Sequence, residues 1–186
     1  MSEYTFKNIE ELDIAGDPPD ALSTGIHIIL FNPITPPPHL LILVHGAVFS
    51  LAVSGPRVNW ALSELVTMLH KRKMPTLFIS LHEPESLVIK DSSVKEYIHD
   101  LTVIHPGVKA NEASCLFPIM EFCKTVYNID ISKVKVIFDL LDQLEHNDLI
   151  DKLWQVNMSK WIVGGEFHIT RYSEEEVSQM ITNLKI

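Results

Sequence analysis

Two short hydrophobic runs separated by His45-Gly46 form the clearest pattern of apolar and polar positions in the chain. The first run covers Leu40 to Val44 and follows His39, and the second covers Ala47 to Val53. Apolar runs of this length joined by a tight turn indicate two antiparallel strands. His39 then begins the first strand, and Ser50 lies near the middle of the second.

Other short apolar runs predict further strands. Residues 25–31 are apolar and rich in β-branched side chains, which is typical of a buried strand. Residues 32–38 include three consecutive prolines, so we expect a stiff, extended path that leads to His39. The remaining predicted strands are residues 75–81, 134–138 and 161–163.

Hydrophobic positions spaced by three or four residues predict the helices. The predicted helices are residues 8–12, 56–72, 91–97, 111–127, 139–156 and 173–184. Apart from residues 91–97, the stretch from His82 to Gly107 shows no pattern that assigns an element.

The helix predicted at residues 111–127 contains a cysteine near its start. Asn111 and Ser114 are both suitable N-caps, and Pro118 belongs in a first helical turn. The proline favours a regular helix that begins near Ser114. Cys115 would then lie at the very start of that helix.

Together these elements predict an α+β fold, with a small, mostly antiparallel sheet packed by helices. At 186 residues the chain is long enough for one domain with a substantial core, which we expect to span residues 1–186. Residues 1–24 are a polar N-terminal segment.

Charge and cysteine content narrow the classes of function. The 24 acidic residues exceed the 15 basic ones, and this balance argues against a nucleic-acid partner, because phosphate contacts need clustered Lys and Arg. No apolar run approaches the roughly 18 residues of a membrane span. The acidic N-terminus lacks a signal-peptide pattern, and two cysteines do not form a disulfide framework. We therefore expect a cytoplasmic protein with free thiols.

Cys115 and His39 are the strongest candidates for chemistry. The start of a helix favours negative charge, so it lowers the pKa of a thiol placed there. A nearby imidazole then serves as base and acid in turn, and a third polar group orients it. Ser50 is the nearest candidate for that third group. The alternative is that Cys115 is a small core residue, the role we assign to Cys123.

The order of these residues resembles the permuted papain-fold cysteine hydrolases, the NlpC-like and lecithin:retinol acyltransferase-like group. Residues 25–31 resemble the first strand of that group, His39 its base and Gly46 its turn. Ser50 takes the place of the third polar residue, often His, and Cys115 the place of the nucleophile. The resemblance implies a papain-like fold of the permuted kind and a thiol nucleophile that needs no cofactor.

Other kinds of site have less support in the sequence. A metal site would have to use His27, His39, His45 and His82-Glu83, but none of these residues has a known ligand spacing. The chain lacks the G-x-S-x-G motif of α/β-hydrolases and the glycine-rich motifs that bind phosphates. We therefore predict neither a metal nor a cofactor.

Two functions remain open at this level. The first is a cysteine-dependent hydrolase or acyltransferase that acts on an amide, ester or thioester of a small molecule or peptide. The second is a non-catalytic binding or scaffold domain, which includes a degenerate relative of the same fold.

Overall fold

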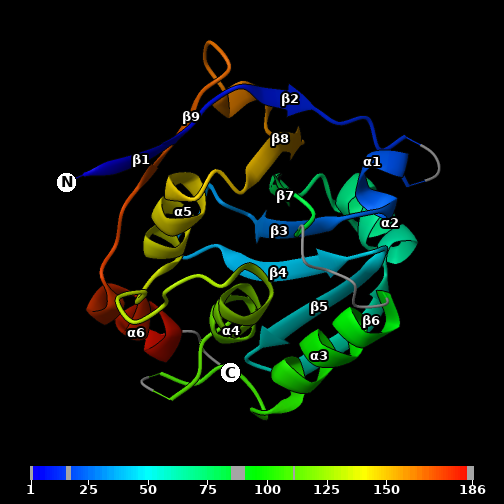
Figure 1. Cartoon of the computed structure of the whole chain (residues 1–186). Coiled ribbons are helices and arrows are strands. Elements are labelled where there is room, and N and C mark those ends of the chain that lie inside the picture. Colours follow the sequence, from blue (N-terminus) through cyan, green and yellow to red (C-terminus); the bar gives the residue numbers. More distant parts are fainter. Residues whose placement is uncertain (1, 16–17, 85–90, 111, 184–186) are drawn as a thin grey trace.

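A seven-stranded sheet forms the centre of the molecule (Figure 1). The structure is a computed structural model, which describes residues 2–15, 18–84, 91–110 and 112–183. In spatial order the strands are β2 (Ile9–Glu11), β8 (Ile150–Val156), β7 (Thr76–Leu81), β3 (Ile26–Phe31), β4 (His39–Val44), β5 (Ala47–Ala52) and β6 (Gly55–Ala61). Only β2 and β8 pair in parallel, so the predicted α+β fold with a mostly antiparallel sheet is confirmed.

The hairpin predicted around His45-Gly46 is present. Both residues have positive φ, 45° for His45 and 79° for Gly46. Two such residues form the tight turn whose twist matches that of antiparallel strands. The ladder runs from the Val44–Ala47 pair only as far as the Ile42–Phe49 pair. The beginning of β4 is therefore not paired with β5.

The predicted helix at residues 56–72 is wrong in its first part. Gly55–Ala61 is the edge strand β6, and helix α2 (Leu62–Arg72) begins only after it. Val58 and Trp60 are half-buried, whereas Arg57 and Asn59 between them are exposed. This alternation has the period of a strand, and pairing with β5 satisfies the backbone of the segment.

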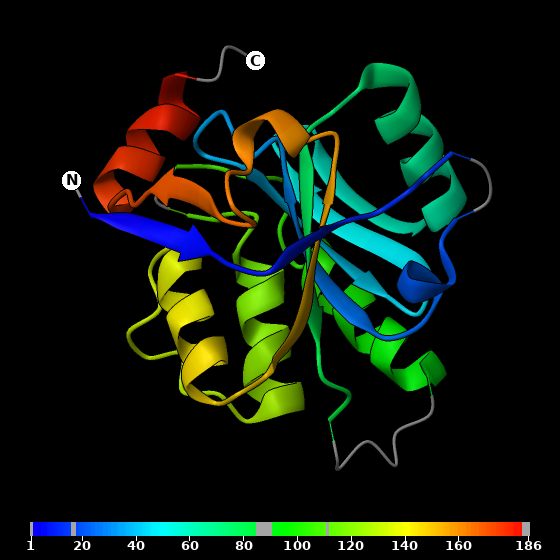
Figure 2. The ribbon, with the colours of Figure 1, turned by 90° about the horizontal axis from the view of Figure 1, so that it is seen from above.

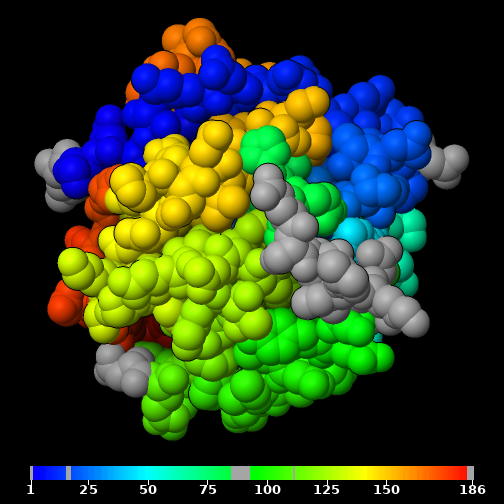
Figure 3. Space-filling model, viewed as in Figure 1, coloured from blue at the N-terminus to red at the C-terminus, as the bar shows by residue number. Residues whose placement is uncertain are grey.

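The sheet is covered by helices on both faces (Figure 2). Helix α2 lies on one face, packed on Leu41, Leu43 and Val48. The other face carries α3 (Asp91–Val103), α4 (Phe117–Tyr127) and α5 (Ile137–His146). These three helices form much of the surface seen in Figure 3. A short helix, α1 (Asp20–Ser23), and a 3-10 turn, η1 (Ser159–Trp161), complete this part of the fold.

Two predictions near residues 134–156 are wrong. No strand forms at residues 134–138, because α5 begins at Ile137 and the Asp139 carboxylate accepts the backbone N–H groups of Lys135 and Val136. The long helix predicted to end at Val156 stops at His146. Asp148 has φ 53°, and the chain then returns as β8, paired with β7.

Three other short elements also differ from expectation. Residues 9–11 form β2 rather than a helix, because they pair with β8. The helix expected at residues 91–97 continues to Val103. Residues 161–163 form no strand: Ser159–Trp161 is η1, and Val163 makes only an isolated bridge with Glu166. Asn111 and Leu184, proposed as helix limits, lie outside the described residues.

A second, two-stranded sheet joins β1 (Glu3–Phe6) to β9 (Phe167–Thr170), and α6 (Glu174–Asn183) follows β9. Tyr4 and Phe6 of β1 belong to the main core. By contrast, α6 has no fully buried residue. Within the described residues, no helix is long and apolar enough to cross a membrane.

Candidate functional site

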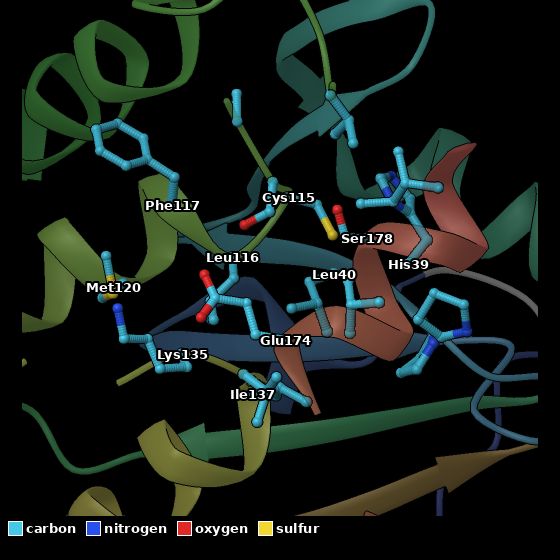
Figure 4. A pocket seen from close by; sticks show the side chains of 18 of the residues that line it. His39, Leu40, Cys115, Leu116, Phe117, Met120, Lys135, Ile137, Glu174 and Ser178 are labelled. Atoms are coloured by element: carbon cyan, nitrogen blue, oxygen red, sulfur yellow. The ribbon is translucent and has the colours of Figure 1, made fainter. Parts of the chain in front are cut away.

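A cavity of about 380 Å³ lies where the start of β4 meets α6 and the beginnings of α4 and α5 (Figure 4). His39 and Cys115, far apart in the sequence, both line it. Met120, Ile137, Tyr172 and Ser178 also line the cavity. Two of the three predicted site residues therefore share one cavity.

The third predicted site residue, Ser50, contacts His39. The His39 Nε2 and Ser50 Oγ atoms are 3.4 Å apart. Ser50 is almost fully buried, with 6% of its surface exposed, so its hydroxyl is fixed beside the ring. This contact leaves His39 Nδ1 as the nitrogen available for another partner.

Cys115 lies just outside the helix in which it was expected. Leu116 is the N-cap of α4 and Phe117 its first residue, so Cys115 directly precedes the cap. Pro118 does lie in the first turn, as predicted. The helix starts later than Ser114 because the backbone N–H of Phe117 already bonds to the Ser114 carbonyl in a tight turn.

Two backbone N–H groups lie near enough to the Cys115 sulfur to favour its charged form, its own and that of Leu40. The second follows from the short ladder between β4 and β5. In a two-residue hairpin the first pair, here Val44–Ala47, is hydrogen-bonded, so every second residue of β4 directs its N–H toward β5. Beyond Ile42 that strand is no longer a partner. The Leu40 N–H is therefore free to donate to the sulfur.

The two candidate groups are both uncharged around neutral pH. Loss of water raises the pKa of the Cys115 thiol, although the two N–H groups act in the opposite direction. Loss of water also lowers the pKa of His39. The expected lowering of the thiol pKa by the helix is therefore wrong here, because burial outweighs the favourable dipoles.

His39 and Cys115 approach the gap between β4 and β5 from different sides. Side chains alternate along a strand, so His39 leaves β4 on the face of Leu41, where it meets Ser50. Cys115 packs with Leu40 on the opposite face. In Figure 4 the sulfur is directed toward Ser178 and His39. No hydrogen bond joins the Cys115 sulfur to the imidazole among the bonds of the described residues.

The interior of the cavity is mainly apolar. Leu116, Phe117, Met120 and Ile137 contribute to one wall, and Val177 and Ile181 of α6 contribute to another. Charged residues of both signs lie around it: Lys109, Glu112, Lys135 and Glu174. A cavity of this kind is suited to an apolar group that carries a small polar function.

The other histidines named as possible ligands, His27, His45 and His82, do not line this cavity, and they lie near one another. His45 and Asp151 both influence the pKa of His27, and Asp151 is also a neighbour of His82. His27 is buried, and its Nε2 atom lies 2.7 Å from the Thr24 carbonyl oxygen. His82 is exposed and lies 3.9 Å from an Asp151 carboxylate oxygen. Within the described part of the chain, no three His, Cys, Asp or Glu residues form a group able to hold a metal ion.

Sequence reasoning missed two groups at this site. The Leu40 N–H group has no partner in β5 because the ladder between β4 and β5 ends before it. No residue pattern in the sequence marks the end of that ladder. Tyr172 reaches the cavity from the segment between β9 and α6, and β9 was not predicted. Cys123, assigned to the core, is fully buried there. Both cysteines are free.

Comparison with known proteins gives no relative for this chain: no family model, curated protein or solved structure matches it.

Proposed function

We propose that the cavity is the site of a cysteine-dependent hydrolase or acyltransferase, with Cys115 as nucleophile and His39 as base and acid. The observation that supports this most directly is that both residues line one cavity while Ser50 holds the far nitrogen of His39. The order of the three groups is that of a nucleophile, a base and an orienting residue. The proposal would make the chain a distant relative of the permuted papain-fold enzymes.

The reaction follows from the uncharged state of the two groups. Substrate binding brings a carbonyl carbon to the Cys115 sulfur. The thiol proton moves to His39 Nδ1 as the carbon–sulfur bond forms. The protonated ring then gives that proton to the leaving alcohol, amine or thiol, and an acyl group remains on Cys115. Water or an acceptor alcohol, deprotonated by His39, releases the acyl group and restores the free thiol.

The substrate class that fits best is an ester or thioester with an apolar acyl group. The apolar walls would hold the acyl part, and the charged residues around the cavity would face a polar leaving group. An activated ester such as p-nitrophenyl butyrate is therefore a suitable probe.

The test is to incubate the protein with p-nitrophenyl butyrate, measure p-nitrophenol release, and locate any acyl adduct by mass spectrometry. We expect the adduct on Cys115, loss of turnover in Cys115→Ser, and a fall of about 10²-fold or more in His39→Ala. Cys123→Ser is the matched control, because that thiol is buried in the core with a pKa raised to about 12. Ester cleavage that Cys115→Ser retains in full would overturn the proposal.

A non-catalytic binding domain is the second candidate, and one observation favours it. Cys115 makes no hydrogen bond to His39 among the bonds of the described residues, and burial keeps its thiol protonated. On this alternative the cavity would hold an apolar ligand without changing it. Wild-type protein that is stabilised against heat by butyrate or octanoate, yet forms no adduct with the ester, would favour binding over catalysis.

A further inference from the structure

A tyrosine shares the cavity with the candidate nucleophile. Tyr172 lies between β9 and α6 and lines the same cavity as Cys115. Its ring meets that of Phe138 edge to face, with the ring centres 4.7 Å apart. Phe138 is fully buried in α5, so it fixes the position of the tyrosine ring.

The hydroxyl of Tyr172 is available as a hydrogen-bond donor. Tyr4 and Tyr97, in contrast, donate to or share a hydrogen bond with Glu145 and Thr125. No partner for the Tyr172 hydroxyl occurs among the hydrogen bonds of residues 2–15, 18–84, 91–110 and 112–183. Burial and the nearby Cys115 thiol raise the pKa of Tyr172, so its hydroxyl keeps its proton around neutral pH.

The proposed reaction needs such a donor. When sulfur attacks a carbonyl carbon, the oxygen becomes negatively charged and must be stabilised by hydrogen bonds in a site with little water. The backbone N–H groups of Leu40 and Cys115 favour negative charge on the sulfur, beside which the intermediate forms. In the free protein both act on the sulfur itself rather than on the position of the substrate oxygen.

We infer that Tyr172 is a catalytic residue, whose hydroxyl donates a hydrogen bond to the oxyanion formed when Cys115 attacks the substrate. This inference rests on the proposed function. The electron pair of the carbonyl π bond moves to oxygen as the carbon–sulfur bond forms, and the thiol proton goes to His39. When the carbonyl re-forms, the leaving group departs with that proton. Tyr172 keeps its own proton throughout.

The experiment compares two reactions of Cys115 in wild type and Tyr172→Phe. Turnover of p-nitrophenyl butyrate passes through an oxyanion, whereas alkylation by iodoacetamide does not. We expect kcat for the ester to fall about 10²- to 10³-fold in Tyr172→Phe, the range for loss of one oxyanion donor. The alkylation rate should stay within about twofold of wild type, because the variant keeps the ring that packs on Phe138.

Tyr97→Phe is the matched control, since it removes a phenol hydroxyl from α3 on the exterior. It should leave both rates unchanged. Equal loss of both reactions in Tyr172→Phe would show a structural role and overturn the inference, as would unchanged ester turnover. Failure of the proposed function would look different: wild type would form no acyl adduct on Cys115 at all, and the inference would fall with it.

Discussion

At the scale of single residues, loss of water determines the charge of the two candidate catalytic side chains. Burial keeps Cys115 as an uncharged thiol because it raises the pKa of an acid, and it keeps His39 as a neutral imidazole because it lowers the pKa of a base.

The uncharged state of both groups has a consequence for kinetics. Ester turnover should rise as His39 loses its proton, at a pH below about 6.5. Alkylation of Cys115 should instead keep rising in the alkaline range, where the thiolate forms.

His27 gives the residue-scale prediction for stability. Burial lowers its pKa in the folded protein. The unfolded chain therefore binds a proton at a higher pH than the folded chain does. The free energy of unfolding should be constant above about pH 7 and fall below about pH 6.5, by up to about 1.4 kcal/mol per pH unit for each such group. His39 contributes to the same fall.

Urea unfolding between pH 5 and pH 8 measures this dependence. His27→Gln should reduce the slope below pH 6.5, whereas His70→Gln, at an exposed site on α2, should not. A slope that His27→Gln leaves unchanged would contradict the assignment to His27.

The sequence correctly predicted a side-chain neighbour of His39, although the ladder between β4 and β5 ends at the Ile42–Phe49 pair, before it reaches either residue. Ser50 was expected to be the neighbour of His39, and the two side chains do meet. The distance between Cys115 and His39 depends on how α4, α6 and β4 pack, which no local pattern encodes. Neither the donor from Leu40 nor the hydroxyl of Tyr172 was foreseen for that reason.

At the scale of elements, local signals identified the strands in the middle of the sheet and failed at its margins. β3 and the β4–β5 hairpin have continuous apolar runs and a clear turn, and both are present. β6 and β8 were predicted as parts of helices. The apolar spacing of β6 continues into α2, which follows it, and the apolar spacing of α5 continues into β8. Asn147-Asp148 separates α5 from β8, and such a pair is a typical turn signal that the spacing concealed.

The end of α2 provides the element-scale prediction. Lys73, its C-cap, has φ 52° and ψ 39°, a left-handed conformation that costs energy for a residue with a Cβ atom. Lys73→Gly should raise the free energy of unfolding by about 0.5–1 kcal/mol. Lys71→Gly, the same change two residues earlier within the helix, should lower it by about 0.5–1 kcal/mol.

Urea or thermal unfolding of both variants tests this prediction, and the two share the same loss of charge. Destabilisation by Lys73→Gly comparable to that by Lys71→Gly would contradict it.

At the scale of the whole molecule, the second sheet connects the beginning of the described chain with the segment that forms one side of the cavity. β1 pairs with β9, and Tyr172 and α6 follow β9 directly. Arg171 makes two hydrogen bonds to the Asp142 carboxylate of α5, at 2.6 and 2.8 Å. The position of Tyr172 therefore depends on contacts with β1 and α5.

Phe6 is the residue whose removal tests this connection. It is 2% exposed, and its ring stacks on that of Phe167 in β9, with the centres 6.2 Å apart. Phe6→Ala should lower the free energy of unfolding by about 3–5 kcal/mol, the usual cost of truncating a buried Phe. Thr5→Ala, on the other side of the same strand, should cost less than about 1 kcal/mol.

Chemical unfolding of the two variants provides the comparison. A loss below 1 kcal/mol for Phe6→Ala would mean that β1 contributes little to the core and does not fix the cavity.

The pairing order of the strands also sets a constraint on synthesis. Among the strands of the described residues, β1 and β2 are synthesised before all the others, whereas their partners β9 and β8 are synthesised after all the others. The strands β3 to β6, in contrast, are consecutive and can pair as soon as they leave the exit tunnel. The nascent chain must therefore carry its first strands unpaired while the sheet assembles behind them. Both strands are short and include acidic residues, Glu3, Glu10 and Glu11, features that discourage wrong edge-to-edge association during that interval.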